Sequence, residues 1–133
     1  MLVLADNDVG GVFAVLRHIL ESAENSPWLE VLGIVFTDFE ALGLPRDASD
    51  RQVWQACQAA EAVLITGNRS GGPDSLDHVI HEFSVETSLP VLTIADPQRV
   101  TRDGAYANLA APRMLDFLER IESLWGVGHL VIP

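Results

Sequence analysis

Short apolar runs alternate along the chain with segments in which apolar residues recur every three or four positions. The runs predict buried strands, and the longer spacing predicts amphipathic helices. Strands are expected at Leu2–Ala5, Val31–Phe36, Ala62–Thr66, Pro90–Ala95 and His129–Ile132. Strands that alternate with helices are typical of a mainly parallel sheet covered on both faces. We therefore predict a three-layer α/β/α sandwich with about five strands, forming one domain over residues 1–133.

Four helical segments are expected between these strands. The first is Val12–Glu24, with a continuous apolar face. The second begins in "ASDRQVWQACQAAEA", where Ser49 and Gln52 have the spacing of a capping box. The other two are Asp74–Glu86 and Gly104–Trp125. Pro112 is expected to kink or split the last helix, because proline cannot donate the helical hydrogen bond.

Length and composition narrow the class of protein. A chain of 133 residues with 48% hydrophobic residues can bury one core, and it is too short for two ordinary domains. It contains neither an apolar run long enough for a membrane helix nor a signal-peptide pattern, so we expect a cytoplasmic protein with no membrane partner. The single cysteine, Cys57, is expected to be a small core residue.

The charge balance is strongly acidic. The net charge is −11, and all eight basic residues are arginines. Without lysine the chain cannot form a P-loop, whose lysine contacts the phosphates of a nucleotide. An acidic protein also repels the nucleic-acid backbone, which weighs against a nuclease. Serine hydrolase chemistry is unsupported, because Ser70 in "GNRSGG" does not lie in a nucleophile elbow.

Polar residues follow most of the predicted strands. Asp6 and Asp8 follow the first strand, Asn68 follows the third, and the helix start places Asp50 at the same edge. Two carboxylates at the end of a buried strand are costly unless a cation neutralises them, so the pattern predicts a metal site. The alternatives are structural: Asp6 and Asp8 could cap the next helix, Asp50 suits any first helical turn, and Asn68 could shape a turn with Gly67. Asp38 and Asp96, which end two other strands, are expected to have structural roles.

The chain resembles a known family in three stretches. The first strand ends in "ADND", a helix begins in "ASDRQVWQACQAAEAVLIT", and "LITGNR" follows. Over roughly residues 1–100, these look like the small bacterial PIN-like domains, which are related to toxin-type ribonucleases. The resemblance implies a three-layer fold and an acidic cluster that binds Mg²⁺ or Mn²⁺ and hydrolyses phosphodiester bonds, with links to toxin–antitoxin systems.

Individual residues correspond to the motifs of this family, and some positions depart from them. Asp6 corresponds to the family's first-strand acid, and Asp50 to the acid that opens the later helix. Asn68 stands where such domains usually carry Asp, and Asp8 stands where Asn is more frequent. Asn68 can ligate a metal through its carbonyl but adds no charge. Asp8, Asp74 or Asp77 could supply the carboxylate that Asn68 lacks. Alternatively, no residue supplies it, and the fold is not catalytic.

Two further sets of residues are candidates for the same edge or for a separate site. Arginines that fall in or near loops after the strands could hold a phosphate chain, although scattered solvated arginines are equally expected: Arg46, Arg69, Arg99 and Arg102. On the third predicted helix, a polar stripe has a spacing that could bind a transition metal: Asp74, Asp77, His78 and His81. A solvated helix face is the favoured interpretation of this stripe.

Two functions follow from the sequence. The first is a metal-dependent ribonuclease that acts on single-stranded RNA, in which Asp6, Asp8 and Asp50 hold Mg²⁺ or Mn²⁺ and Asn68 completes the catalytic set. The second is a catalytically degenerate PIN-like domain that serves as an interaction module for a cognate protein partner. The acidic set favours the first, while Asn68 and the net charge favour the second. A homo-oligomer is compatible with both.

Overall fold

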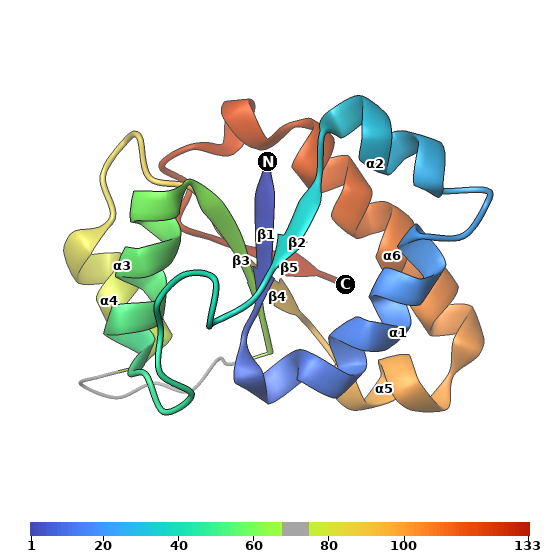
Figure 1. Ribbon diagram of the computed structural model, residues 1–133, viewed down its shortest axis with the longest axis horizontal. Coiled ribbons are helices and arrows are strands. Elements are labelled where there is room, and N and C mark those ends of the chain that lie inside the picture. The colour runs from blue at the N-terminus through green and yellow to red at the C-terminus, as the bar shows by residue number, and fades with distance from the viewer. Residues whose placement is uncertain (68–74) are drawn as a thin grey trace.

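The computed structural model describes residues 1–67 and 75–133, and it has the predicted three-layer α/β/α architecture (Figure 1). Five strands form one entirely parallel sheet in the order β2-β1-β3-β4-β5. The strands are β1 (Leu2–Ala5), β2 (Val35–Thr37), β3 (Ala62–Thr66), β4 (Val91–Ile94) and β5 (His129–Ile132). The predicted class and strand number are confirmed.

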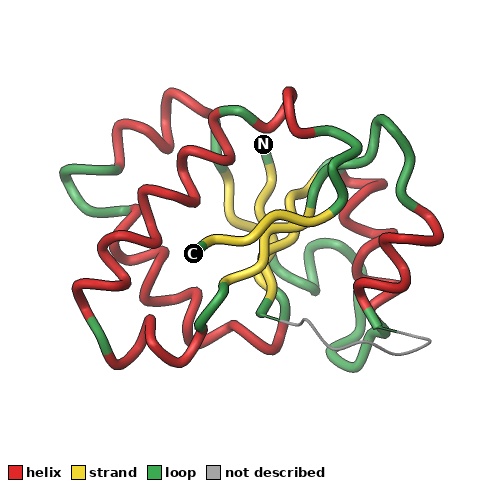
Figure 2. Tube along the Cα trace, turned by 180° about the vertical axis from the view of Figure 1, so that it is seen from behind, coloured by secondary structure: helices red, strands yellow, loops and turns green. Residues whose placement is uncertain are grey.

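Helices cover both faces of the sheet. One layer contains α1 (Gly10–Leu20), α2 (Ser26–Leu32), α5 (Pro97–Arg102) and α6 (Gly104–Glu119), and the other contains α3 (Asp50–Ala60) and α4 (Leu76–Phe83). Figure 2 shows the twisted strands between these two layers. Two 3-10 helices, η1 (Asn7–Val9) and η2 (Ile121–Leu124), follow β1 and α6. No helix in the described part of the chain is both long enough and apolar enough to span a membrane.

Alternating residues of the strands fill two cores. Val3 and Ile65 face the layer of α1 and α6, whereas Leu4 and Leu64 face α3 and α4. Because both faces of a parallel sheet are buried, its strands are mostly apolar, as in β3, where all five residues are buried and only Thr66 is polar. Cys57 is buried in the second core, as expected, and burial raises the pKa of its thiol to about 12.

Several predicted boundaries were wrong. The strand expected at Val31–Phe36 is only Val35–Thr37, because α2 occupies Ser26–Leu32. Pro27 lies in the first turn of this helix, where a missing N–H costs nothing. Gly33 ends it with a left-handed backbone (φ +64°). The short helix α5 was also not predicted, although Asp96 and Pro97 form a typical helix start.

The remaining helices are shorter than predicted. The helix expected at Val12–Glu24 spans Gly10–Leu20, and the one expected at Asp74–Glu86 spans Leu76–Phe83 after its N-cap Ser75. The helix that begins at Gly104 runs through Pro112 without a break and ends at Glu119. Pro112 is exposed, so the carbonyl that loses its donor can be hydrated, and the predicted split does not occur.

Candidate functional site

The carboxyl edge of the sheet, where the strands end, holds the candidate site. The strand order reverses between β1 and β3, and in open parallel sheets this reversal is where ligands bind. The hydrogen bonding between β1 and β3 extends to the first residue of the site, because the Asp6 N–H donates to the Ile65 carbonyl at 2.8 Å. The residues that follow β1 and β3 are therefore side by side.

Asp6 and Asp8 converge on one hydroxyl group. Thr66 Oγ1 lies 3.4 Å from Asp6 Oδ2 and 3.3 Å from Asp8 Oδ1. Asp8 Oδ2 also accepts a hydrogen bond from the Gly67 backbone N–H at 3.2 Å. Since a hydroxyl has one hydrogen, Thr66 can donate to only one of the two carboxylates at a time. The other carboxylate then receives no hydrogen from Thr66, although each keeps a backbone donor, Asn7 for Asp6 and Gly67 for Asp8.

The sequence allowed Asp6 and Asp8 to cap the helix that follows β1, but only Asp6 caps a helix, and that helix is η1 and not α1. Asp6 is the N-cap of η1, where its side chain accepts the Asn7 N–H at 2.8 Å. Helix α1 begins after Val9, which makes no side-chain cap. Neither aspartate therefore caps α1, and Asp8 instead reaches across to β3.

Asp50 reaches the same edge through the start of α3. The predicted capping box is present, because Ser49 Oγ accepts the Gln52 N–H while Gln52 Oε1 accepts the Ser49 N–H. Asp50 is the first residue of the helix and is partly buried. Its negative charge raises the pKa of both Asp6 and Asp8, so the three carboxylates share one electrostatic environment.

Burial and like charge raise the pKa values of the two central aspartates. For Asp6, desolvation is the main cause, followed by the charge of Asp8. For Asp8, desolvation is again the main cause, and the hydrogen bonds from Gly67 and Thr66 act in the opposite direction. The Asp8 residue is exposed overall, but its carboxylate packs against β3. Such a site favours a bound proton or cation, because either relieves the repulsion.

The donor set suits a hard cation, although the geometry is not a closed metal cage. Carboxylate and hydroxyl oxygens match Mg²⁺ or Mn²⁺, which take one or two carboxylates and fill the remaining positions with water. Within residues 1–67 and 75–133, no three His, Cys, Asp or Glu side chains are arranged to hold a metal ion together. Asp6 and Asp8, which converge on Thr66, are therefore a pair of carboxylates and not part of a three-ligand group in this part of the chain. Asn68 and Asp74 lie outside the described residues.

Gly67 is a site residue that the sequence interpretation assigned only to a turn. Its N–H binds Asp8, and a Cβ at this position would lie 2.7 Å from Pro97 Cγ and 2.9 Å from Val9 Cγ1. The chain therefore needs glycine here to bring β3, η1 and α5 together. A glycine directly after a buried strand, as in "LITG", is the signal that could have indicated this close approach.

An open groove of about 800 Å³ adjoins the aspartates. Asn7, which stands between Asp6 and Asp8, lines it together with Thr37, Asp38 and Arg46. The Asn7 side chain donates to the Arg46 carbonyl at 2.6 Å, which fixes the loop beside the site. Asp38 accepts the Ala41 N–H at 2.8 Å, so it has the structural role that was expected.

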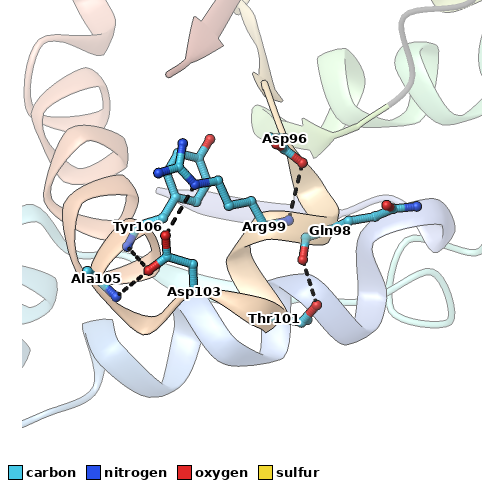
Figure 3. A network of polar contacts seen from close by, with 7 residues as sticks. All are labelled: Asp96, Gln98, Arg99, Thr101, Asp103, Ala105 and Tyr106. Carbon is cyan, nitrogen blue, oxygen red and sulfur yellow. Dashed lines mark hydrogen bonds and ion pairs between the residues drawn. The ribbon is translucent and has the colours of Figure 1, made fainter.

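Arg99 belongs to a network beyond β4 (Figure 3). Asp96 accepts the Arg99 N–H at 3.2 Å, the structural role predicted for it, and Asp103 Oδ2 accepts Arg99 Nε at 3.3 Å. The guanidinium lies 4.7 Å from the centre of the Tyr106 ring. The backbone N–H of Tyr106 and the charge of Arg99 lower the pKa of Asp103. Arg99 is thus engaged locally, Arg46 and Arg102 are exposed, and Arg69 lies outside the described residues.

The polar stripe on α4 divides into separate pairs. Asp77 Oδ1 lies 3.0 Å from His129 Nδ1, and the other ring nitrogen of His129 contacts the buried Thr93 hydroxyl. His78 pairs with Glu82 at 3.1 Å. His81 is exposed, and Asp74 lies outside the described residues. The described members therefore do not converge on a shared metal position.

Comparison with known proteins adds no identification: no family model, no curated protein and no solved structure matches this chain. The resemblance to PIN-like domains stays a prediction from the sequence.

Proposed function

We propose that this protein is a divalent-metal-dependent ribonuclease that hydrolyses phosphodiester bonds of single-stranded RNA at the carboxyl edge of its sheet. The observation that carries the proposal is the convergence of Asp6 and Asp8 on Thr66 at the strand-order reversal. Holding two partly buried like charges together costs stability, and proteins keep such arrangements where they bind or react. Mg²⁺ or Mn²⁺ is the cation that this oxygen donor set would hold.

Each residue has a distinct role in this proposal. Asp6 and Asp8 hold the cation, and Asp50 adds negative charge and orients water at the start of α3. Thr66 and the Gly67 N–H keep the carboxylates of Asp6 and Asp8 facing one another. The bound cation supplies an activated water and charge stabilisation for the leaving oxygen. The groove beside Asn7 and Arg46 is the path along which the RNA chain approaches.

A second function has its own support. The net charge of −11, the lack of lysine and the absence of a three-ligand group among the described residues favour a degenerate PIN-like domain that binds a cognate protein. A domain of this kind would keep the acidic edge for structure or for contact with a basic partner. The toxin–antitoxin setting that the resemblance implies belongs to the ribonuclease proposal.

Cleavage of a fluorescent single-stranded RNA in the presence of Mn²⁺ tests the nuclease. We expect Asp6→Asn to reduce the rate at least about 100-fold, because it removes a charged ligand from the reacting centre. Asn68→Asp is expected to preserve or raise the rate by adding a hard charged ligand. Asp47→Asn, which removes an exposed acid from the nearby loop, is the matched control and should leave the rate unchanged.

Two results would refute the nuclease. Cleavage that continues in EDTA or in Asp6→Asn would identify a contaminating enzyme. No cleavage by the wild type or by Asn68→Asp, at metal concentrations that raise its stability, would leave the interaction module as the better explanation.

A further inference from the structure

The amino edge of the sheet, opposite the acidic site, carries an exposed apolar surface that the proposed hydrolysis does not use. Three of the large apolar residues exposed at this edge lie around one groove: Val85 (61%), Trp125 (47%) and Val127 (51%). They lie in the loop between α4 and β4 and in the segment between η2 and β5. We call this surface the Trp125 patch. Exposed apolar side chains that gather in one place mark interaction sites more often than isolated ones do.

Trp125 stands between two grooves. On one side, a groove of about 480 Å³ is lined by Val85, Glu86 and Val127, among others. On the other side, a groove of about 560 Å³ includes Leu89, Glu61 and Glu122. Trp125 lines both. Tryptophan at the centre of a hollowed surface is a frequent source of binding energy in protein interfaces.

The patch is held in place by its backbone. The Gly126 N–H donates to the Ser88 carbonyl at 2.8 Å, and the Val85 N–H donates to Ser88 Oγ at 3.0 Å. Gly126 has a left-handed backbone (φ +80°), and a Cβ there would lie 2.8 Å from the Glu86 carbonyl oxygen. The two segments are thus joined tightly, as their neighbouring course in Figure 1 shows. A surface that is already ordered loses little conformational entropy on binding.

The charge around the patch selects the partner. Glu61, Glu86 and Glu122 line the two grooves, and among the described residues no arginine or histidine lines either one. The amino group of Met1 is nearby, but it donates to the Gly33 carbonyl. A second copy of the chain would bring another net charge of −11 and the same glutamates to the contact. Anionic lipid is disfavoured for the same reason.

We propose that the Trp125 patch is the docking surface for a partner-protein segment in which an apolar anchor is flanked by basic side chains. The anchor packs against Trp125 and Val127, and the basic side chains pair with Glu86 and Glu122 at the rim. This proposal does not rest on the hydrolytic function, because the patch and the acidic site occupy opposite edges of the sheet.

Fluorescence anisotropy with labelled peptides tests the proposal. The probe is a peptide with Leu-Trp-Leu between pairs of arginines. One comparator replaces the arginines with glutamates, and the other replaces Leu-Trp-Leu with Gly-Ser-Gly. We expect the probe to bind at least about tenfold more tightly than either comparator, because it alone supplies both the anchor and the charge. Equal binding of the probe and the Gly-Ser-Gly peptide would reduce the effect to general attraction by an acidic protein and overturn the proposal.

Variants of the protein locate the contact. Trp125→Ala and, separately, Val127→Ser should each weaken binding, by about tenfold for the tryptophan. Both residues are exposed, so the second variant keeps the test decisive if Trp125→Ala is destabilised. Trp28→Ala is the control, since Trp28 is 50% exposed on α2 and lines neither groove. Loss of binding that is equal in Trp28→Ala and Trp125→Ala would overturn the assignment.

Two double variants test how much the glutamate charges contribute to binding. Glu86→Gln combined with Glu122→Gln should weaken binding about threefold and flatten its dependence on salt. Glu40→Gln combined with Asp47→Asn removes the same charge from the carboxyl edge and should have a smaller effect. Sedimentation of the protein alone and binding to phosphatidylcholine vesicles test the other occupants. A dimer, or vesicle binding, that Trp125→Ala abolishes would overturn the proposal in favour of a second copy or a lipid surface.

Discussion

At the carboxyl edge of the sheet, two carboxylates share one threonine hydroxyl, whereas at the amino edge an exposed tryptophan stands between two grooves. Hydrogen bonds to the aspartate side chains, from the Thr66 hydroxyl and the Gly67 backbone N–H, hold the first arrangement against electrostatic repulsion. Backbone hydrogen bonds and a left-handed glycine hold the second. The two edges therefore respond to different perturbations: the acidic site to protons and cations, and the Trp125 patch to backbone changes.

The largest effect is expected from Gly126→Ala at the amino edge. Its Cβ would meet the backbone of Glu86, and its positive φ disfavours any side chain, so the two costs add and we expect a loss of more than about 3 kcal/mol in the free energy of unfolding. Gly33→Ala, which has a positive φ but open space around its Cβ, should cost only about 1 kcal/mol. Urea denaturation measures both. Equal losses would show that steric contact with Glu86 adds nothing to the rigidity of the patch.

A divalent cation should act only through the carboxyl edge. Mg²⁺ or Mn²⁺ at 100 times its dissociation constant should raise the free energy of unfolding by about 2.7 kcal/mol, because it binds the folded state alone. Asp6→Asn should abolish this gain, and Glu86→Gln at the amino edge should keep it. Thermal denaturation at increasing metal concentrations measures this gain in stability. If saturating metal leaves the wild-type transition unchanged, the aspartates have only a structural role.

The smallest expected effect is a dependence of stability on pH in the absence of metal. Asp6 and Asp8 have pKa values in the folded protein that are raised above the ordinary 3.8. Between the ordinary and the raised values, the folded state binds more protons than the unfolded state, so stability falls as the pH increases through this range. At neutral pH with EDTA, Asp6→Asn should therefore be more stable than the wild type, by about 1 kcal/mol or less. If Asp6→Asn were less stable than the wild type, the hydrogen bond that the Asp6 carboxylate accepts from Asn7 would outweigh its repulsion by Asp8.

Local patterns predicted the parts of the fold that local chemistry determines. β1, β3 and β5 have the predicted bounds, because each is a short apolar run with clear limits. The capping box at Ser49 was visible in the sequence and places Asp50 at the edge where it was expected. The helix at Ser26–Leu32 was missed because its apolar residues continue toward β2, and only Pro27 and Gly33 mark its ends.

The candidate site was also only partly predictable from local sequence patterns. The sequence placed Asp6, Asp8 and Asp50 at one edge, since strand ends and helix starts meet there. It could not show that Thr66 would lie between the two aspartates, because that contact depends on the register of β1 against β3. The pairing of Asp77 with His129 was invisible for a similar reason, because the two residues belong to elements far apart in the chain.

The pairing of β1 with β3 also affects how the protein folds. Asp6 and Thr66 are separated by 60 positions in the chain, and the intervening residues form α1, α2, β2 and α3. Contacts between distant parts of a chain require the closure of a long loop, which slows folding. The chain must therefore order much of its first half before the acidic site exists. During refolding, we expect the capacity to bind a cation to develop with the global transition rather than with early helix formation.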